Sequence, residues 1–362
     1  MKYALIGCGR ISPFHLQSAI DTHLEIVGLC DKDLSHAVSL AKEYHLAHTH
    51  LYDNYLEMIE REKPTFVAVA TESGSHYQIV MDILSMGVHV LVEKPMAMSL
   101  HDADQMIAKA QEMQVFLGVC QQNRLNDSTQ LVKKALDCGA FGKLSHGSLA
   151  VRWSRAQDYY DQAPWRGKWE SDGGTLMNQC IHGLDLLRWF MGSNVKSVTS
   201  HLANRFHPYL EVEDVGIGFV LFCDGSVATI EGTTNVYEDN LEESITLIGQ
   251  KGSVVLGGQV ADEIKYWHFE NEEVDGWGKN LDVKPFSSVY GNGHVRIYSD
   301  FIDSIQNHHR PYVDGKDGRN ALEMVLSMYE SHRLGKSVNL PLQEASTSDM
   351  QGINLGNQPR EY

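Results

Sequence analysis

Glu93, Lys94 and Pro95 follow directly on the apolar segment 88–92. The segment predicts a buried strand, so the charged pair stands where that strand ends. Ligands of an open parallel sheet bind outside the carboxyl ends of its strands. We therefore expect Lys94 to point into a binding cleft, where an ammonium group can stabilise negative charge that develops during a reaction. A solvated lysine in an ordinary strand–helix loop is the alternative.

A second candidate group lies in the segment 171–185, and the sequence predicts a helix over about 176–191. Asn178 and His182 are four residues apart and would share one face of that helix. His182 suits proton transfer because imidazole titrates near neutral pH, and Asp185 is placed to orient the ring. A structural histidine is the alternative. No further ligand stands at metal-binding spacing in this segment, so we expect no metal.

The N-terminus predicts a dinucleotide site. The strand 2–6 runs into a turn in which Gly7 and Gly9 keep two positions of G-x-G-x-x-G and Ser12 replaces the third glycine. Such a turn brings a pyrophosphate to a helix N-terminus. Asp31 ends the next strand, where an acid binds the ribose hydroxyls and favours NAD over NADP. The expected cofactor contacts of this region are Gly7, Gly9, Arg10, Ile11 and Asp31.

The loop after the predicted strand 66–70 reaches the same edge of the sheet. Thr71 and His76 are therefore candidate cofactor contacts. A helix-capping role for Ser75 and a surface position for His76 are equally open interpretations.

Aromatic and basic side chains alternate over 151–169. Rings supply stacking area and guanidinium groups bind oxyanions in a bidentate manner, which suits a substrate with a flat base, sugar rings and phosphates or a carboxylate. A cluster at a domain interface and a nucleic-acid platform are the alternatives. The candidate substrate contacts are Arg152, Arg155, Tyr159, Tyr160, Asn178, His182 and Lys94.

Strands and helices alternate over residues 1–120, as in a doubly wound parallel sheet with helices on both faces. The expected strands are 2–6, 25–30, 66–70, 88–92 and 115–119. The expected helices are 13–21, 34–44, 53–61, 76–86 and 99–113. We assign residues 1–122 to a first domain.

The pattern changes after Gln121, where strands follow one another without intervening helices. The expected strands are 144–153, 195–203, 215–223, 226–233, 244–249 and 263–269, and the expected helices are 126–138, 296–308 and 316–334. They predict an open, mostly antiparallel sheet with helices on one face, over 123–342, followed by a polar arm or disordered tail at 343–362. The uncovered face favours self-association.

Composition narrows the class of protein. The 362 residues carry a formal net charge of −17, which argues against a nucleic-acid partner. No apolar run is long enough for a membrane helix, and the chain starts with a core strand rather than a signal peptide. The six scattered cysteines form no CxxC pair and fit buried positions in a reducing compartment. We expect a cytoplasmic enzyme.

These motifs, in this order over about residues 1–340, resemble the glucose–fructose oxidoreductase/inositol dehydrogenase (Gfo/Idh/MocA) family. The resemblance implies a Rossmann domain, an open-sheet domain, and dimers or tetramers. It places Lys94 and His182 at the nicotinamide as the catalytic residues. It also implies that Glu93, Trp165 and Arg166 frame the cofactor and that Gln121 and Arg124 border it. Many members have aspartate where this chain has Asn178, which cannot act as a base.

Within the family, the segments 152–160, 164–169 and 178–182 look most like UDP-N-acetyl-2-amino-2-deoxyglucuronate dehydrogenases, which oxidise the sugar C3 hydroxyl for bacterial surface polysaccharide. The implied activity is NAD-dependent oxidation of a sugar hydroxyl on a UDP-sugar. Dehydrogenation of a free polyol or sugar, a sugar-phosphate or aldose oxidoreductase with bound cofactor, and a non-catalytic nucleotide-binding regulator are the alternatives.

Overall fold

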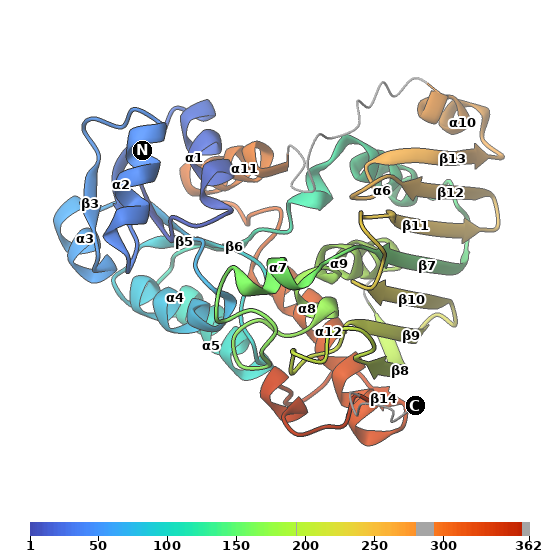
Figure 1. Cartoon of the computed structure of the whole chain (residues 1–362). Helices are drawn as coiled ribbons and strands as arrows, with labels where there is room; N and C mark the ends of the chain where they lie inside the picture. The colour runs from blue at the N-terminus through green and yellow to red at the C-terminus, as the bar shows by residue number, and fades with distance from the viewer. Residues whose placement is uncertain (193, 280–292, 357–362) are drawn as a thin grey trace. The chain divides into compact units, whose positions relative to one another are not determined.

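The computed structural model describes residues 1–192, 194–279 and 293–356. The described chain divides into two compact units. The first comprises 1–97, 101–122 and 293–319, and the second comprises 98–100, 123–279 without residue 193, and 320–356. Each unit is built around one β-sheet (Figure 1).

The first unit contains a six-stranded sheet in which all neighbouring strands are parallel. In spatial order the strands are β3 (His50–Tyr52), β2 (Glu25–Cys30), β1 (Lys2–Ile6), β4 (Phe66–Val69), β5 (His89–Val92) and β6 (Leu117–Val119). The connecting helices are α1 (Ser12–Asp21), α2 (Leu34–Glu43), α3 (Tyr55–Glu62), η1 (Ser73–Ser75), α4 (His76–Ser85) and α5 (Leu100–Glu112).

Strand order reverses at β1, which lies between β2 and β4. The loops after β1 and β4 therefore leave the sheet in opposite directions and open a crevice at its carboxyl edge, where dinucleotides bind in such folds. The predicted doubly wound parallel sheet is confirmed. Short β3 was missed because its three residues show no clear apolar alternation.

A helix from the C-terminal third completes the first unit. Tyr298 and Phe301 of α11 (Gly293–Asn307) are fully buried, and Phe301 lies against Gly118 of β6. The Tyr298 hydroxyl lies 2.8 Å from that of Tyr3 in β1. Residues 293–319 therefore group with the first unit, which differs from the sequence-based assignment of 123–342 to one domain. Amphipathicity identified this helix but did not identify the sheet it covers.

The second unit contains an eight-stranded sheet that is antiparallel except for the pair β7–β10. In spatial order the strands are β13 (Glu263–Phe269), β12 (Gly252–Gly257), β11 (Glu242–Gly249), β7 (Leu144–Arg152), β10 (Val227–Thr233), β9 (Val215–Phe222), β8 (Val195–Ala203) and β14 (Val338–Asn339). Its helices are η2 (Gln122–Leu125), α6 (Asp127–Asp137), α7 (Gln157–Asp161), α8 (Thr175–Asn178), α9 (Ile181–Phe190), α10 (Glu272–Lys279), α12 (Gly315–Leu334) and η3 (Thr347–Met350). Gln122 and residues 315–319 of α12 group with the first unit.

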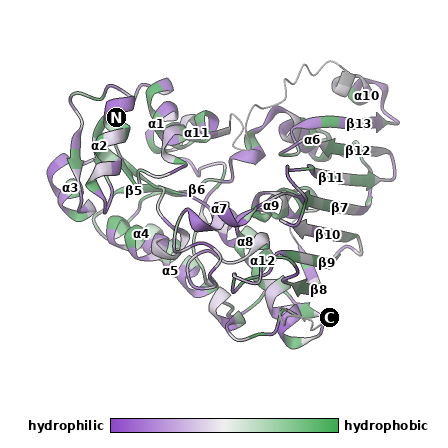
Figure 2. Ribbon diagram, viewed as in Figure 1, coloured by the Kyte–Doolittle hydropathy of each residue, from purple (hydrophilic) through white to green (hydrophobic). Residues whose placement is uncertain are grey.

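Helices cover one face of this sheet. Gly147 of β7 faces Leu187 of α9, and Gly216 of β9 faces Leu176 of α8. Alternation puts the next residues on the other face, where Ile217 is 50% exposed and Phe219 is 46% exposed. Figure 2 shows hydrophobic residues along these strands and a hydrophilic α7. The predicted open sheet with one helix-covered face is confirmed.

The predicted C-terminal tail is ordered through residue 356. The Leu100 N–H donates to the carbonyl of Ala345, and the Thr347 N–H donates to that of Met98. Thr347 and Met350 are buried. The alternative of a disordered tail is therefore wrong for residues 343–356, whose backbone pairs with residues 98–100. Residues 357–362 lie outside the described part.

Among the described residues, no helix has both the length and the apolar character needed to cross a membrane.

Candidate active site

The glycine turn has one closed side and one open side. Gly7 has φ +93°, and a Cβ there would lie 2.5 Å from the carbonyl oxygen of Ala70. A Cβ on exposed Gly9 would meet no described atom within 4 Å. Gly7 is thus required by packing between β1 and β4, whereas Gly9 leaves open space that a side chain would fill. That arrangement fits close approach of a pyrophosphate.

The remaining predicted contacts of the turn flank this open side. Arg10 is exposed, and half-buried Ile11 is the N-cap residue of α1. The Asp31 carboxylate accepts hydrogen bonds from the N–H groups of Cys8 (2.8 Å) and Asp33 (2.9 Å). A carboxylate offers about four acceptor positions, so Asp31 retains capacity for ribose hydroxyls. It also ties the glycine turn to the end of β2.

The polar side chains of the loop after β4 form hydrogen bonds with other groups of the first unit. The hydroxyl oxygens of Thr71 and Ser75 are 2.8 Å apart. His76 is buried, with Nδ1 2.8 Å from the Pro95 carbonyl and Nε2 3.2 Å from the Thr71 carbonyl. The predicted cofactor contact of His76 is therefore not supported, because protein carbonyls face both ring nitrogens. A surface position is also wrong for this residue.

Glu93 is the last residue before Lys94 and is 6% exposed. Its Oε1 lies 3.1 Å from His15 Nε2 and 3.3 Å from His294 Nε2. Burial opposes ionisation, yet the hydrogen bonds from both histidines hold the pKa of Glu93 well below its usual range. The predicted direct cofactor contact of Glu93 is not supported, because the carboxylate is directed into the first unit.

Lys94 is half-buried at the carboxyl end of β5, and the Lys94–Pro95 peptide bond is cis. Its N–H donates to Glu93 Oε2 (3.2 Å). Gln121 follows β6 at the same edge of the sheet and is buried. Thus the residues expected at the carboxyl edge of the first unit are found there.

Arg124 belongs to the second unit and is committed to an ion pair. Its Nε and Nη2 donate to the two carboxylate oxygens of Asp185 at 2.7 and 2.6 Å, and both side chains are buried. This bidentate pair fixes α9 against the segment 122–125. The predicted position of Arg124 at the cofactor stays a prediction, since the structure gives the guanidinium a structural partner.

Asn178 and His182 lie on two helices rather than one. Asn178 ends α8 and half-buried His182 is the second residue of α9. The Cys180 N–H donates to the carbonyl of Thr175, five residues back, which widens the turn and breaks the predicted helix. The amide nitrogen of Asn178 donates to Asp172, a buried carboxylate. This bond fixes the amide so that its oxygen points away from Asp172.

Arg152 is held by ion pairs within the second sheet. It alternates with Val151 along β7 and therefore lies on the sheet face opposite α9. Its guanidinium pairs with Glu231 of β10 and Glu242 of β11. The predicted substrate contact of Arg152 is not supported, because its guanidinium is already paired with two carboxylates on that face.

Arg155 and Arg166 both lie over one shared aromatic residue. The Tyr159 ring centre is 5.1 Å from the Arg155 guanidinium and 4.3 Å from that of Arg166. The Trp153 ring centre lies 4.9 Å from the Arg155 guanidinium, and the Trp165 ring centre lies 4.5 Å from that of Arg166. Arg166 Nη1 donates to the Tyr159 hydroxyl (2.6 Å), and its Nε is buried without a hydrogen bond among the described residues. The alternating pattern thus forms a cation–π stack.

Tyr160 is part of the core rather than of this stack. It is buried, and its ring packs against His207 at 5.6 Å. His207 bonds through Nδ1 to Asp214 (2.9 Å) and through Nε2 to the carbonyl of Arg155 (2.7 Å). The predicted substrate contact of Tyr160 is therefore not supported. The His207–Asp214 pair anchors the segment that carries Arg155.

The comparisons with known proteins agree with this geometry. A model of the oxidoreductase family with an NAD-binding Rossmann fold matches residues 1–121, and a model of the GFO/IDH/MocA C-terminal domain matches residues 129–255. The chain belongs to the Gfo/Idh/MocA oxidoreductase family. The first unit of this Gfo/Idh/MocA protein is accordingly an NAD-binding domain.

Three relatives of this Gfo/Idh/MocA protein illustrate the range of the family. The WlbA dehydrogenase from Bordetella pertussis, whose crystal structure is in complex with NADH and UDP-GlcNAcA, has 34% sequence identity to this chain. The TM-score is 0.86, and the match covers 94% of this chain and 98% of that one. The D-apiose dehydrogenase of Paraburkholderia graminis is 26% identical over 98% of this chain and 94% of its own. The D-glucoside 3-dehydrogenase of Escherichia coli is 25% identical over 94% of this chain and 97% of its own.

Sequence reasoning missed several residues that hydrogen-bond to the predicted site residues of this Gfo/Idh/MocA protein or to the segments that carry them. They are His15, His294, Asp172, His207, Asp214 and Glu213. Asp172 lies in the candidate segment 171–185, so its position there was the one signal that the sequence offered. His15, His294 and Glu213 are far in sequence from the residues they contact, whereas His207 and Asp214 are seven residues apart.

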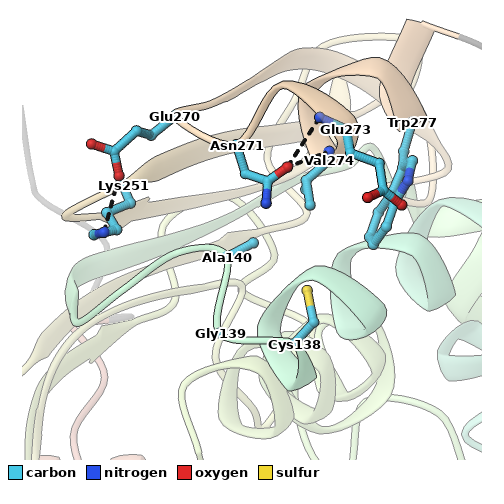
Figure 3. A pocket seen from close by; sticks show the side chains of 9 residues that line it. All are labelled: Cys138, Gly139, Ala140, Lys251, Glu270, Asn271, Glu273, Val274 and Trp277. Atoms are coloured by element: carbon cyan, nitrogen blue, oxygen red, sulfur yellow. Dashed lines mark hydrogen bonds and ion pairs between the residues drawn. The ribbon is translucent and has the colours of Figure 1, made fainter.

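A pocket of about 540 Å³ lies elsewhere in the second unit, between the end of α6 and α10 (Figure 3). Cys138 and Trp277 line it, and Lys251 pairs with Glu270 (3.0 Å) at its border. None of the predicted site residues lines this pocket, so it is separate from the candidate active site.

Proposed function

We propose that this Gfo/Idh/MocA protein uses NAD to oxidise a secondary hydroxyl group of a negatively charged nucleotide sugar, namely the C3 hydroxyl of UDP-N-acetyl-2-amino-2-deoxyglucuronate. The observation that carries the proposal is the stack of Arg155 and Arg166 on Tyr159. Neither guanidinium has a carboxylate partner among the described residues, although the chain has a net charge of −17. An anionic ligand would supply the missing partner.

The relatives support an acidic nucleotide sugar over other ligands. The Bordetella pertussis dehydrogenase was crystallised with NADH and UDP-GlcNAcA, and it shares 34% identity with this chain over nearly its whole length. The enzymes named for D-apiose and D-glucosides share 26% and 25%. Their substrates lack the phosphates and carboxylate that the two arginines would bind.

The proposed chemistry divides among three side chains. His182 takes the proton of the reacting hydroxyl group, because a neutral imidazole is a base near pH 7. The ammonium group of Lys94 stabilises the developing alkoxide. Asn178 orients the hydroxyl group, and its own amide is positioned by the bond to Asp172. Asn178 itself transfers no proton.

The cofactor-binding role is proposed for the carboxyl edge of the first unit. The turn at Gly7 and Gly9 would hold the pyrophosphate, with Arg10 and Ile11 beside it, and Asp31 would bind the ribose. Thr71 and Gln121 lie at the same edge. NAD supplies a hydride acceptor when it is bound. The predicted roles of Trp165 and Arg166 beside the cofactor remain part of the proposal, and Arg166 would contribute to binding the substrate as well.

A binding experiment tests the proposal. Titration calorimetry with NAD present should show UDP-N-acetyl-2-amino-2-deoxyglucuronate binding at least about tenfold more tightly than methyl glucoside, apiose or myo-inositol, because only the nucleotide sugar pairs with both arginines. Arg155→Ala and Arg166→Ala should each weaken that binding by about tenfold or more. Arg333→Ala removes one positive charge from a surface ion pair and serves as the control.

Turnover of a neutral sugar, with no effect of the Arg155 and Arg166 variants on its KM, would favour a free-sugar dehydrogenase instead. Binding of NAD without oxidation of any hydroxyl compound in the panel would favour a nucleotide-binding regulator.

A further inference from the structure

We propose that His15 and His76 are paired positioning residues that hold the Glu93–Lys94–Pro95 segment from two sides, each through one ring nitrogen. His15 acts on Glu93 and His76 acts on Pro95. Neither histidine is assigned to contact substrate or cofactor. The inference rests on the proposed function only in taking Lys94 as the reactive group that needs to be held.

The hydrogen-bond directions around His15 follow from donor counting. A carboxylate only accepts, so His15 Nε2 donates to Glu93 Oε1 across 3.1 Å. Burial lowers the pKa of His15, so the neutral ring predominates and Nδ1 is an acceptor. Nδ1 then accepts from the Tyr298 hydroxyl at 2.8 Å, and Tyr298 in turn accepts from Tyr3 at 2.8 Å. Each donor in this buried chain is directed toward Glu93.

The Glu93 carboxylate also holds the backbone of the next residue. Its Oε1 accepts from both His15 and His294, while its Oε2 accepts from the N–H of Lys94. A carboxylate held at three points has little rotational freedom, so the peptide between Glu93 and Lys94 is fixed with it. The Lys94 backbone therefore has its orientation set from inside the first unit.

His76 holds the other side of the segment. Burial lowers its pKa too, and a neutral imidazole carries one N–H group. The shorter contact, 2.8 Å from Nδ1 to the Pro95 carbonyl, takes that N–H, whereas Nε2 is 3.2 Å from the Thr71 carbonyl. His15 and His76 come from the first turns of α1 and α4, so two helices of the nucleotide-binding unit brace one short segment.

The cluster around Glu93 also has a metal-like composition. Ligand atoms of His15, Glu93 and Cys120 all lie within 4.8 Å of one another, and all three residues are buried. The hydrogen bonds account for the imidazole and the carboxylate without an ion, and burial raises the pKa of the Cys120 thiol well above its usual range. A metal ion on His15 Nε2 would have to displace the hydrogen bond to Glu93, which favours the positioning role.

Amide side chains test the inference because each imitates one ring nitrogen. A glutamine amide reaches the place of Nε2 and an asparagine amide reaches that of Nδ1. His15→Gln should keep the bond to Glu93, and His15→Asn should lose it. The order reverses at the second position, where His76→Asn should keep the bond to Pro95 and His76→Gln should lose it. A role in packing alone predicts no such reversal.

The readout is amide hydrogen exchange of a peptide covering residues 93–98, followed by mass spectrometry, which needs no substrate. His15→Asn and His76→Gln should raise exchange in this peptide by about tenfold, while His15→Gln and His76→Asn leave it near the wild-type rate. Melting temperature and NAD binding, measured on all four variants, identify any global loss of folding. With substrate, kcat should follow the same reversal while KM for NAD stays unchanged.

Equal effects of the two amides at each position would overturn the inference. One equivalent of tightly bound zinc, lost in His15→Gln and in Cys120→Ser, would overturn it for His15. Lys94→Ala separates this result from the proposed function. If that variant keeps full turnover, the proposed role of Lys94 fails, whereas the exchange pattern still decides whether the two histidines hold the segment.

Discussion

Hydrogen-bond accounting at single residues separates groups that face a ligand from groups that hold them. Glu93 and His76 stand beside the expected binding edge, but their polar atoms are used by other parts of the first unit. Arg155 and Arg166 show the opposite situation, because aromatic rings surround them and no described carboxylate neutralises them. Chemistry at this scale depends on which lone pairs and protons remain available.

Replacement of Lys94 tests the reactive group. Lys94→Ala should lower kcat by roughly 10²-fold or more, since the ammonium would no longer stabilise the alkoxide, and should leave the Kd for NAD nearly unchanged. Steady-state kinetics and NAD titration measure the two effects. Lys94→Arg is the matched variant that keeps the charge but changes its geometry. Near-normal turnover in Lys94→Ala would remove this residue from the mechanism.

Replacement of Asp31 tests the choice of cofactor. The carboxylate would bind ribose hydroxyls and repel a 2′-phosphate, so Asp31→Ala should raise KM for NAD and relax the discrimination against NADP by about tenfold or more. Because Asp31 also accepts from the Cys8 N–H, Asp31→Asn is a useful second variant that keeps an acceptor without the charge. An unchanged preference for NAD would mean that another residue reads the ribose.

At the scale of elements, the start of α8 is built around a buried acid. Glu213 Oε1 accepts from the N–H of Leu176 (2.9 Å) and from the hydroxyl of Tyr329 (3.1 Å). A Cβ on Gly174 would clash with this carboxyl group, so glycine is required there. Burial raises the pKa of Glu213 to about 8. The helix that ends in Asn178 therefore begins on a carboxyl group that is protonated at neutral pH.

This arrangement predicts a pH dependence of stability. The folded state keeps a proton on Glu213 that the unfolded chain releases near its ordinary pKa, so the free energy of unfolding falls as pH rises toward about 8. The slope from this group approaches about 1.4 kcal/mol per pH unit. Glu213→Gln should flatten it, and urea unfolding at pH 5, 6.5 and 8 measures the difference. Parallel pH profiles for the two proteins would refute the assignment.

At the scale of the molecule, the second sheet has an uncovered face with apolar residues. Ile217 and Phe219 on β9 and Tyr266 on β13 are each about half exposed. Large sheets of this kind bury such a face by association with a second copy. The sequence-based expectation of a dimer or tetramer therefore keeps a physical basis.

Charge on this face should prevent association. Ile217→Glu combined with Phe219→Glu should convert the oligomer into a monomer, which light scattering coupled to gel filtration detects, because desolvating carboxylates in an apolar contact is costly. Val38→Glu, at a 49% exposed position of α2 in the first unit, is the matched charge control away from this face. A wild-type protein that is already monomeric at micromolar concentration would contradict the expectation.

The order of elements and the glycine turn could be predicted from sequence because they depend on local patterns. Apolar runs of strand length, helical periodicity and the segment 7–12 fix a parallel sheet with a dinucleotide edge. Contacts between distant residues could not be predicted. Only the tertiary structure shows the ion pair of Arg152 with Glu231 and that of Arg124 with Asp185. It also shows that His15 and His294 both contact the Glu93 carboxylate. Packing decides which polar groups are already satisfied, and no local pattern records that.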